Sequence, residues 1–221
     1  MMEQVTQVTN QFCDAIQTKL GHVRNAASLL IDSDIIPEAK QDELEEMLTT
    51  SGIHELKKLL YRGTSDGMTP KAFHDKCDGQ GPTLVLVRTE KDWIFGGYAG
   101  TPWDSPPYPH YVDDPSCFVF NVVNPWNDPI TKMPVLQPER AMYCDAAYGP
   151  AFPGAFGLYN RFNDPEGPLD CGWASGFHAS YGPYGDPLGR GFQTFVDDSE
   201  DGYEFTPIEI EVFAVTNNCQ K

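Results

Sequence analysis

The sequence predicts an α+β fold that is mainly β: a sandwich of two antiparallel sheets with short edge helices, preceded by an α-helical N-terminal hairpin. Three observations lead to this fold class. Short apolar runs lie between glycine- and proline-rich turns, which is typical of strands. The 19 prolines and 20 glycines occur among aromatic residues, which favours a loop-rich β fold over disorder. A stripe of apolar residues with helical spacing marks the N-terminal part.

The net charge of the chain restricts its partners. Fifteen Lys and Arg residues stand against 32 Asp and Glu residues, which gives a formal net charge of −17. Because this charge repels phosphates, we expect no binding to nucleic acid or to anionic lipid. No apolar stretch approaches the ~20 residues of a membrane span, and no N-terminal run resembles a signal peptide. We therefore expect a cytoplasmic protein without a membrane span.

The cysteines are consistent with that compartment. The chain has six, none of them in a Cys-x-x-Cys pair: Cys13, Cys77, Cys117, Cys144, Cys171 and Cys219. Without a secretion signal, such cysteines are expected to be reduced thiols, and three disulfides are the alternative. A role as oxidant scavengers would require exposed thiols of lowered pKa, and the sequence places little positive charge near any of them.

Three helices are predicted before the β-rich part. The first covers residues 3–31, where a narrow apolar stripe fits a coiled-coil seam, and hence a homo-oligomer, or docking on the next helix. The second covers Glu38–Thr50, with Ser33 and Asp34 as caps and a proline in its first turn. Ile53–Leu60 is predicted as a third, short helix because its apolar residues have helical spacing.

These helices predict a chain of two parts. Residues 1–52 form a helical extension, which either self-associates as a coiled coil or serves for docking. Residues 53–221 form the β-sandwich domain. The alternative, which the sequence leaves open, is that both long helices simply pack on the domain that follows them.

The domain is organised around a predicted β-hairpin. A short helix over residues 71–77 precedes it, with Thr69 as N-cap and a proline at the first helical position. Thr83–Val87 is an apolar run that predicts a strand buried on both faces. After a polar turn, Trp93–Tyr98 predicts the second strand. Two adjacent glycines in that strand indicate a bulge or a close backbone approach.

Further strands are expected along the rest of the chain. Their predicted bounds are Cys117–Val123, Ala141–Cys144, Ala155–Tyr159, Gly176–Tyr181, Gly191–Val196 and Phe205–Val215. The proline-rich stretches 99–115 and 124–138 are expected to be loops, including the tract at 106–109, for which a polyproline ligand is the alternative. In the last strand, apolar residues alternate with Glu209 and Glu211, which predicts one buried face and outward-pointing carboxylates.

Several short motifs follow one another along the chain in a characteristic order. They are Leu60-Tyr61-Arg62, Ala72-Phe73-His74, Lys76-Cys77-Asp78-Gly79, Gly81-Pro82-Thr83-Leu84-Val85, Phe95-Gly96-Gly97-Tyr98, Trp103, Phe118-Val119-Phe120 and Ile210-Glu211-Val212-Phe213. Together they resemble the TLDc domain family over roughly residues 55–216. The hairpin motifs are specific, whereas the proline-rich inserts at 101–138 and 160–190 depart from the family pattern. The helical extension lies outside the resemblance.

This resemblance implies a fold and a function. The implied fold is a sandwich of two antiparallel sheets with short helices at its edges. The implied function is that of a non-enzymatic protein-interaction module, linked to oxidative-stress resistance or to regulation of the vacuolar proton-pumping ATPase (V-ATPase). Subunits of that pump are therefore the implied protein partners, and no cofactor is implied.

An acidic turn near the C-terminus supports a different function. Asp197, Asp198, Glu200 and Asp201 offer the hard oxygen ligands that Ca²⁺ prefers, so a Ca²⁺-responsive binding protein is one alternative. The turn lacks the alternating ligand order of a dedicated calcium loop, which favours a solvated surface turn. A second acidic region, around residues 104–114, is interpreted in the same way.

Two further groups of residues are candidates for catalysis. Glu209 and Glu211 share one face of the last strand and, if they faced a cleft, would form a carboxylate pair for hydrolysis. His74 and Cys77 share a helix face, as a nucleophile pair would, but a Cys before a buried strand usually packs as a small hydrophobic residue. No histidine pair has zinc-ligand spacing, and no glycine-rich stretch has that of a phosphate-binding loop.

Overall fold

The computed structural model describes residues 33–160, 165–174, 185, 195–196 and 204–217. These residues belong to a compact unit that spans Asp32–Lys221. As predicted, the described part is mainly β, with antiparallel sheets and a few short helices. The predicted helix over residues 3–31 lies outside it. In the described part, no helix is long and apolar enough to cross a membrane.

The elements follow one another in a simple order. The helices are α2 (Glu38–Thr50), α3 (Gly63–Asp66), α4 (Pro70–Cys77) and the 3₁₀ helix η1 (Pro138–Arg140). The strands are β1 (Ile53–Arg62), β2 (Thr83–Thr89), β3 (Ile94–Ala99), β4 (His110–Val112), β5 (Phe118–Val123), β6 (Thr131–Pro134), β7 (Met142–Cys144), β8 (Tyr148–Phe152), β9 (Phe156–Tyr159), β10 (Cys171–Ala174), β11 (Glu204–Phe205) and β12 (Pro207–Asn217).

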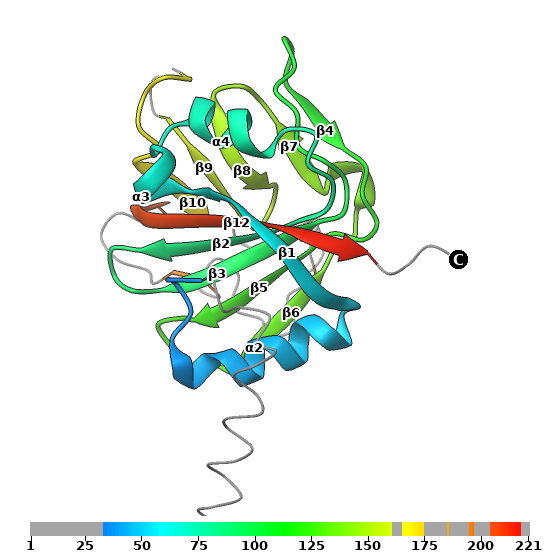
Figure 1. The fold of residues 1–221 in the computed structure, drawn as a ribbon, viewed down its shortest axis with the longest axis vertical. Coiled ribbons are helices and arrows are strands. Elements are labelled where there is room, and N and C mark those ends of the chain that lie inside the picture. Colours follow the sequence, from blue (N-terminus) through cyan, green and yellow to red (C-terminus); the bar gives the residue numbers. More distant parts are fainter. Residues whose placement is uncertain (1–32, 161–164, 175–184, 186–194, 197–203, 218–221) are drawn as a thin grey trace, which may run out of the picture. The chain divides into compact units, whose positions relative to one another are not determined.

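The predicted hairpin forms the middle of the largest sheet. Among the described residues there are three sheets, ordered β1-β12-β2-β3-β5-β6, β11-β10-β9-β8 and β4-β7 (Figure 1). Strands β2 and β3 pair antiparallel, with Val85 opposite Gly97, and every residue of β2 except Arg88 is buried. The hairpin and the burial of its first strand on both faces are therefore confirmed.

The main core lies between the six-stranded and the four-stranded sheet. Phe95 on β3 contacts Phe156 on β9, with ring centroids 5.0 Å apart, and both rings are fully buried. A Cβ placed on Gly97 would lie 2.6 Å from the ring of Phe152 on β8. Only a glycine leaves room for this ring, so the close neighbour of Gly97 in the facing sheet is a side chain and not the backbone that the sequence indicated.

Helix α2 covers the opposite face of the six-stranded sheet. It packs against β1 at one edge of the sheet, and the Glu43 carboxylate accepts a hydrogen bond of 2.7 Å from the Ile130 amide, next to β6 at the other edge. Its apolar residues Leu44 and Leu48 are fully buried. The second predicted helix is thus confirmed, and it packs on the domain that follows it (Figure 1).

The prediction of a helix over Ile53–Leu60 is wrong, because this segment is strand β1 and pairs antiparallel with β12. The pairing is interrupted three times by register shifts, so that the apolar residues of β1 do not alternate strictly. The predicted caps of α2 are also wrong. Pro37 is the N-cap and makes no side-chain hydrogen bond, while Ser33 and Asp34 bind elsewhere.

The remaining predictions divide into three groups. Strands β5, β7, β9 and β12 and helix α4, capped by the Thr69 side chain, are confirmed. Strands β4, β6, β8 and β10 were missed, because they are short and lie in segments rich in proline and glycine. The predicted strand at 176–181 lies outside the described residues. Of the one predicted at 191–196, only Phe195 and Val196 are described, and they form a turn.

Candidate functional site

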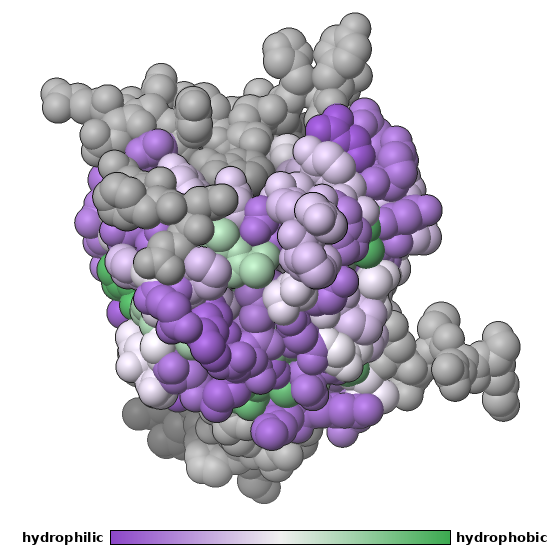
Figure 2. Space-filling view, turned by 90° about the horizontal axis from the view of Figure 1, so that it is seen from above, coloured by the Kyte–Doolittle hydropathy of each residue, from purple (hydrophilic) through white to green (hydrophobic). Residues whose placement is uncertain are grey.

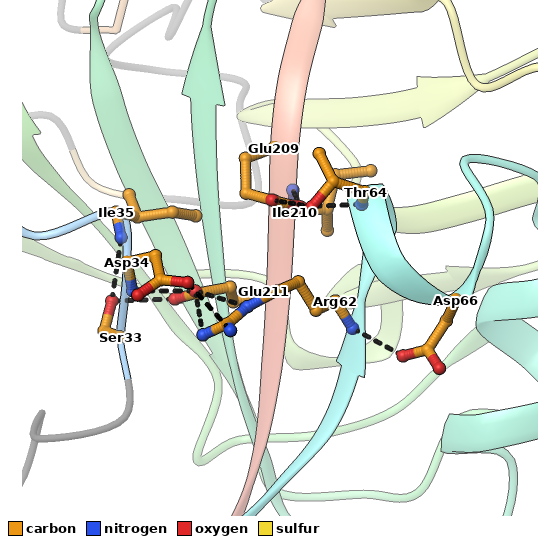
Figure 3. A network of polar contacts seen from close by, with 9 residues as sticks. All are labelled: Ser33, Asp34, Ile35, Arg62, Thr64, Asp66, Glu209, Ile210 and Glu211. Carbon is orange, nitrogen blue, oxygen red and sulfur yellow. Dashed lines mark hydrogen bonds and ion pairs between the residues drawn. The ribbon is translucent and has the colours of Figure 1, made fainter.

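Glu209 and Glu211, the candidate carboxylate pair, lie on the central strand β12. The outward orientation predicted for them is wrong, because Glu211 is fully buried and Glu209 is 8% exposed. Strand β12 lies between β1 and β2, so it has no open edge. Residues 33–34 and α3 cover the two carboxylates on this face of the strand (Figure 3).

The carboxylate of Glu211 is surrounded by donors from two distant segments. Arg62 donates from Nε and Nη2 to Oε1, at 3.1 and 2.9 Å. The Ser33 hydroxyl donates to Oε2 at 2.7 Å, and the Asp34 amide donates to Oε1 at 2.9 Å. Arg62 also pairs with the Asp34 carboxylate at 2.8 Å. Glu211 therefore links residues 33–34, which precede α2, to strand β12 inside the sheet.

The carboxylate of Glu209 serves a neighbouring turn. It accepts hydrogen bonds from the backbone amide and the hydroxyl of Thr64, and one of 3.0 Å from the Ile210 amide. Thr64 lies in α3, directly after β1, so this contact fixes the end of β1 over β12 (Figure 3). A hydrolytic pair needs carboxylates that can reach a substrate. Both of these carboxylates are instead buried and occupied by donors from the chain itself.

His74 forms a second buried polar site, at the C-terminal end of α4. Its Nδ1 lies 2.7 Å from the Asp78 carboxylate, and its Nε2 lies 3.0 Å from the carbonyl oxygens of Asp145 and Tyr148. All three partners are acceptors, so the ring fits best with both nitrogens protonated. Burial opposes the charge, but the hydrogen bond and charge of Asp78 outweigh it and raise the pKa of His74. His74 thus joins α4 to the turn before β8.

The cysteines behave as packing residues. Cys77, Cys117, Cys144 and Cys171 are buried free thiols, and the other two lie outside the described residues. Burial raises the pKa of Cys77 strongly and that of Cys144 to about 12, so both remain protonated at neutral pH. Cys77 therefore packs as a small hydrophobic residue, as the sequence indicated, and not as a nucleophile.

The predicted calcium ligands Asp197, Asp198, Glu200 and Asp201 lie outside the described residues, so calcium binding there stays a prediction. In the second acidic region, Asp114 is buried and accepts hydrogen bonds from the Thr101 and Ser116 amides at 2.6 and 2.9 Å. Within the part of the chain that the structure describes, no three His, Cys, Asp or Glu side chains are grouped as metal ligands.

Four tyrosines form a continuous row that crosses from the two-stranded to the four-stranded sheet. We call Tyr111, Tyr143, Tyr148 and Tyr159 the tyrosine ridge. Tyr111 and Tyr143 are paired across β4 and β7, and Tyr148 and Tyr159 across β8 and β9. Successive ring centroids lie 5.3, 5.5 and 5.9 Å apart. Tyr111 is 48% exposed and the other three are partly exposed, so the ridge lies at the surface.

Charged side chains lie beside both ends of the tyrosine ridge. The Arg140 guanidinium lies 4.9 Å from the centre of the Tyr111 ring, and the Tyr159 hydroxyl donates to Glu204 at 3.4 Å. Burial and the nearby Asp145 raise the pKa of Tyr143, so its hydroxyl stays neutral. The end of the unit where α4, β4 and β7 lie is mostly hydrophilic, with small, separate hydrophobic patches (Figure 2).

Sequence reasoning missed both the buried ion pair and the ridge. Arg62 and Glu211 are 149 positions apart, and only the pairing of β1 with β12 brings them together. The ridge depends on four short strands, of which β4 lies in a stretch predicted as a loop and β8 was not predicted as a strand. One signal for the ridge was present in the sequence: Tyr148 begins β8 and Tyr159 ends β9, and each borders an apolar run.

The fold and these sites define a mainly β domain that is held together by buried polar contacts and carries an aromatic row at its surface. The chain belongs to the TLDc domain family, whose model matches residues 29–216. This match confirms the resemblance and begins further upstream than predicted, so that it includes α2. Over 65 residues the chain is 39% identical to the MTOR-associated protein MEAK7 of Danio rerio; this stretch is 29% of the chain and spans 14% of that relative.

Proposed function

We propose that this chain is a non-enzymatic protein-interaction module of the TLDc type. Membership of that family over residues 29–216 is the observation that carries the proposal. The described sites support it. The carboxylates of Glu209 and Glu211 are engaged by donors of the chain itself, and the Cys77 thiol is buried beside His74 with a raised pKa. The exposed aromatic side chains offer surface for contact.

The relatives indicate where to look for partners. The family resemblance points to V-ATPase subunits and to oxidative-stress resistance, and the Danio rerio relative is described as MTOR-associated. We propose a cytoplasmic module whose first candidate partners are subunits of the pump, followed by proteins associated with mTOR. We further propose that residues 3–31 provide a homo-oligomeric contact, which light scattering of the full chain, compared with a chain starting at Asp32, would detect.

Affinity capture tests the proposed function. The full chain, attached to a resin through one terminus, is incubated with a eukaryotic lysate, and bound proteins are quantified by mass spectrometry. The control resin carries the same chain after irreversible unfolding. The proposal predicts specific enrichment of a defined set of proteins on the folded chain, with pump subunits among them. Repeated enrichment of nothing above the control, with a chain shown to be folded by circular dichroism, contradicts it.

A further inference from the structure

The tyrosine ridge has the composition of a surface that receives guanidinium groups. Aromatic faces attract cations, and arginine more often than lysine, because the planar guanidinium also stacks on the ring. The chain already shows this contact once. The Arg140 guanidinium lies over the Tyr111 ring at the end of the ridge, 4.9 Å from its centre, and its Nη2 lies 3.4 Å from the Tyr111 hydroxyl.

Two carboxylates lie at the ridge itself: Asp145 is 3.5 Å from the Tyr143 hydroxyl, and Glu204 is 3.4 Å from the Tyr159 hydroxyl. Residues 99–160, which supply all four tyrosines, contain six carboxylates and only two fixed cations, Lys132 and Arg140. The carboxylates are Asp104, Asp113, Asp114, Asp128, Glu139 and Asp145. Of the two cations, Lys132 lies on β6 over the ring of Phe118, in a different sheet. Carboxylates beside exposed rings complement a cationic ligand and disfavour an anionic one.

The spacing of the rings fits an extended peptide. Successive centroids are between 5.3 and 5.9 Å apart, and alternate side chains of an extended chain recur at about 7 Å. Long flexible arginine side chains accommodate the difference, so arginines of one segment can reach neighbouring rings of the ridge. We infer that the tyrosine ridge, Tyr111-Tyr143-Tyr148-Tyr159, binds an arginine-rich segment of a protein partner. This inference rests on the proposed function as an interaction module.

Two peptides of equal charge test the inference. One carries four Arg-Ser repeats and the other four Lys-Ser repeats, both labelled with fluorescein, and binding to the full chain is followed by fluorescence anisotropy. The ridge predicts that the arginine peptide binds at least about twofold more tightly, because a guanidinium stacks on the rings in addition to its cationic attraction. Equal affinities for the two peptides would mean that only net charge attracts them, and would overturn the inference.

A matched pair of variants locates the site. Arg140→Gln and Lys132→Gln each remove one positive charge and one cation–ring contact, but only the first frees a ring of the ridge. We expect Arg140→Gln to bind the arginine peptide at least twofold more tightly than Lys132→Gln does. Equal affinities of the two variants contradict the inference. Neither variant alters a fully buried side chain, so both should fold.

Replacing one tyrosine of the ridge should weaken binding of the arginine peptide. Tyr143→Leu should weaken binding of the arginine peptide by about two- to fivefold, the value of one cation–ring contact, whereas Trp126→Leu should not. Trp126 is a suitable control because it is 49% exposed, as Tyr111 is, and lies outside the ridge. If the wild-type chain captures protein partners but shows no preference for arginine, the ridge inference fails and the interaction module stands. If it captures no partner, the proposed function itself fails.

Discussion

Arg62 on β1 and Glu211 on β12 form an ion pair, 2.9 Å between Nη2 and Oε1, in which the carboxylate is fully buried. Both strands lie at one side of the six-stranded sheet, and the same two side chains bind Asp34 ahead of α2. The pair therefore connects three segments that are far apart in the sequence: the approach to α2, the edge strand and the last strand.

Removal of the arginine should strongly destabilise the domain. Arg62→Met leaves the Glu211 carboxylate buried without its cation, and breaking such a pair lowers the free energy of unfolding by about 3 kcal/mol. Urea unfolding followed by tryptophan fluorescence measures this loss. Lys71→Met is the control, because it breaks only the exposed pair of Lys71 with Asp75 and should leave the midpoint unchanged. Equal midpoints for both variants would show that the buried pair contributes nothing.

The charge of His74 should make part of the stability depend on pH. The folded pKa is raised above the ordinary value of 6.5, so protons bind the folded state more tightly than the unfolded state. The contribution of His74 is therefore complete below about pH 6.5 and is lost as the pH rises through the folded pKa. We expect the difference in unfolding free energy between wild type and His74→Gln to shrink as the pH rises from 6 to 9. A difference that grows over this range contradicts the charged imidazole.

The close approach of the sheets at Gly97 predicts a severe effect of a small substitution. Gly97→Ala places a methyl group against the Phe152 ring, and such overpacking costs about 1–3 kcal/mol of folding stability. A thermal or urea melt measures the loss. In the Phe152→Leu background the same substitution should cost less, because the obstructing ring is gone. Gly185→Ala is the control, since the nearest atoms to its added Cβ lie at an ordinary 3.7 Å.

Burial of the thiols predicts slow reaction with a disulfide reagent. In the native protein Cys77, Cys117, Cys144 and Cys171 should not react with Ellman's reagent on the minute scale, and all should react after unfolding in urea. The absorbance of the released thiolate counts them. Rapid native reaction of more than two thiols would contradict the packing role and favour a function as an oxidant scavenger.

Local signals predicted the hairpin, and non-local contacts explain what the sequence could not predict. The turn residues before Thr83 and the apolar run after them act within a dozen positions, so the pattern alone identified β2 and β3. In β1, Ile53, Leu56 and Leu59 have the spacing of a helix. Register shifts against β12 allow a strand to carry this spacing, and the sequence gives no sign of them.

Contacts between remote segments also explain why the sites could not be predicted in full. Alternation in β12 correctly indicated that Glu209 and Glu211 share a face, but the face is covered, because Thr64 and Ser33 come from remote segments. Buried carboxylates are rare unless they are paired, so the pattern favoured a solvent-exposed position for both side chains. The ridge escaped prediction because Tyr111 lies in a proline-rich segment that was predicted as a loop.

We propose that this TLDc chain acts by contact with another protein. The most direct test of this proposal is equilibrium binding between the purified full chain and a purified partner recovered by affinity capture, measured by isothermal titration calorimetry. We expect saturable binding at a fixed stoichiometry, with no chemical change in the partner. Absence of binding by the folded chain, or a heat signal that continues as the partner is chemically converted, would contradict it.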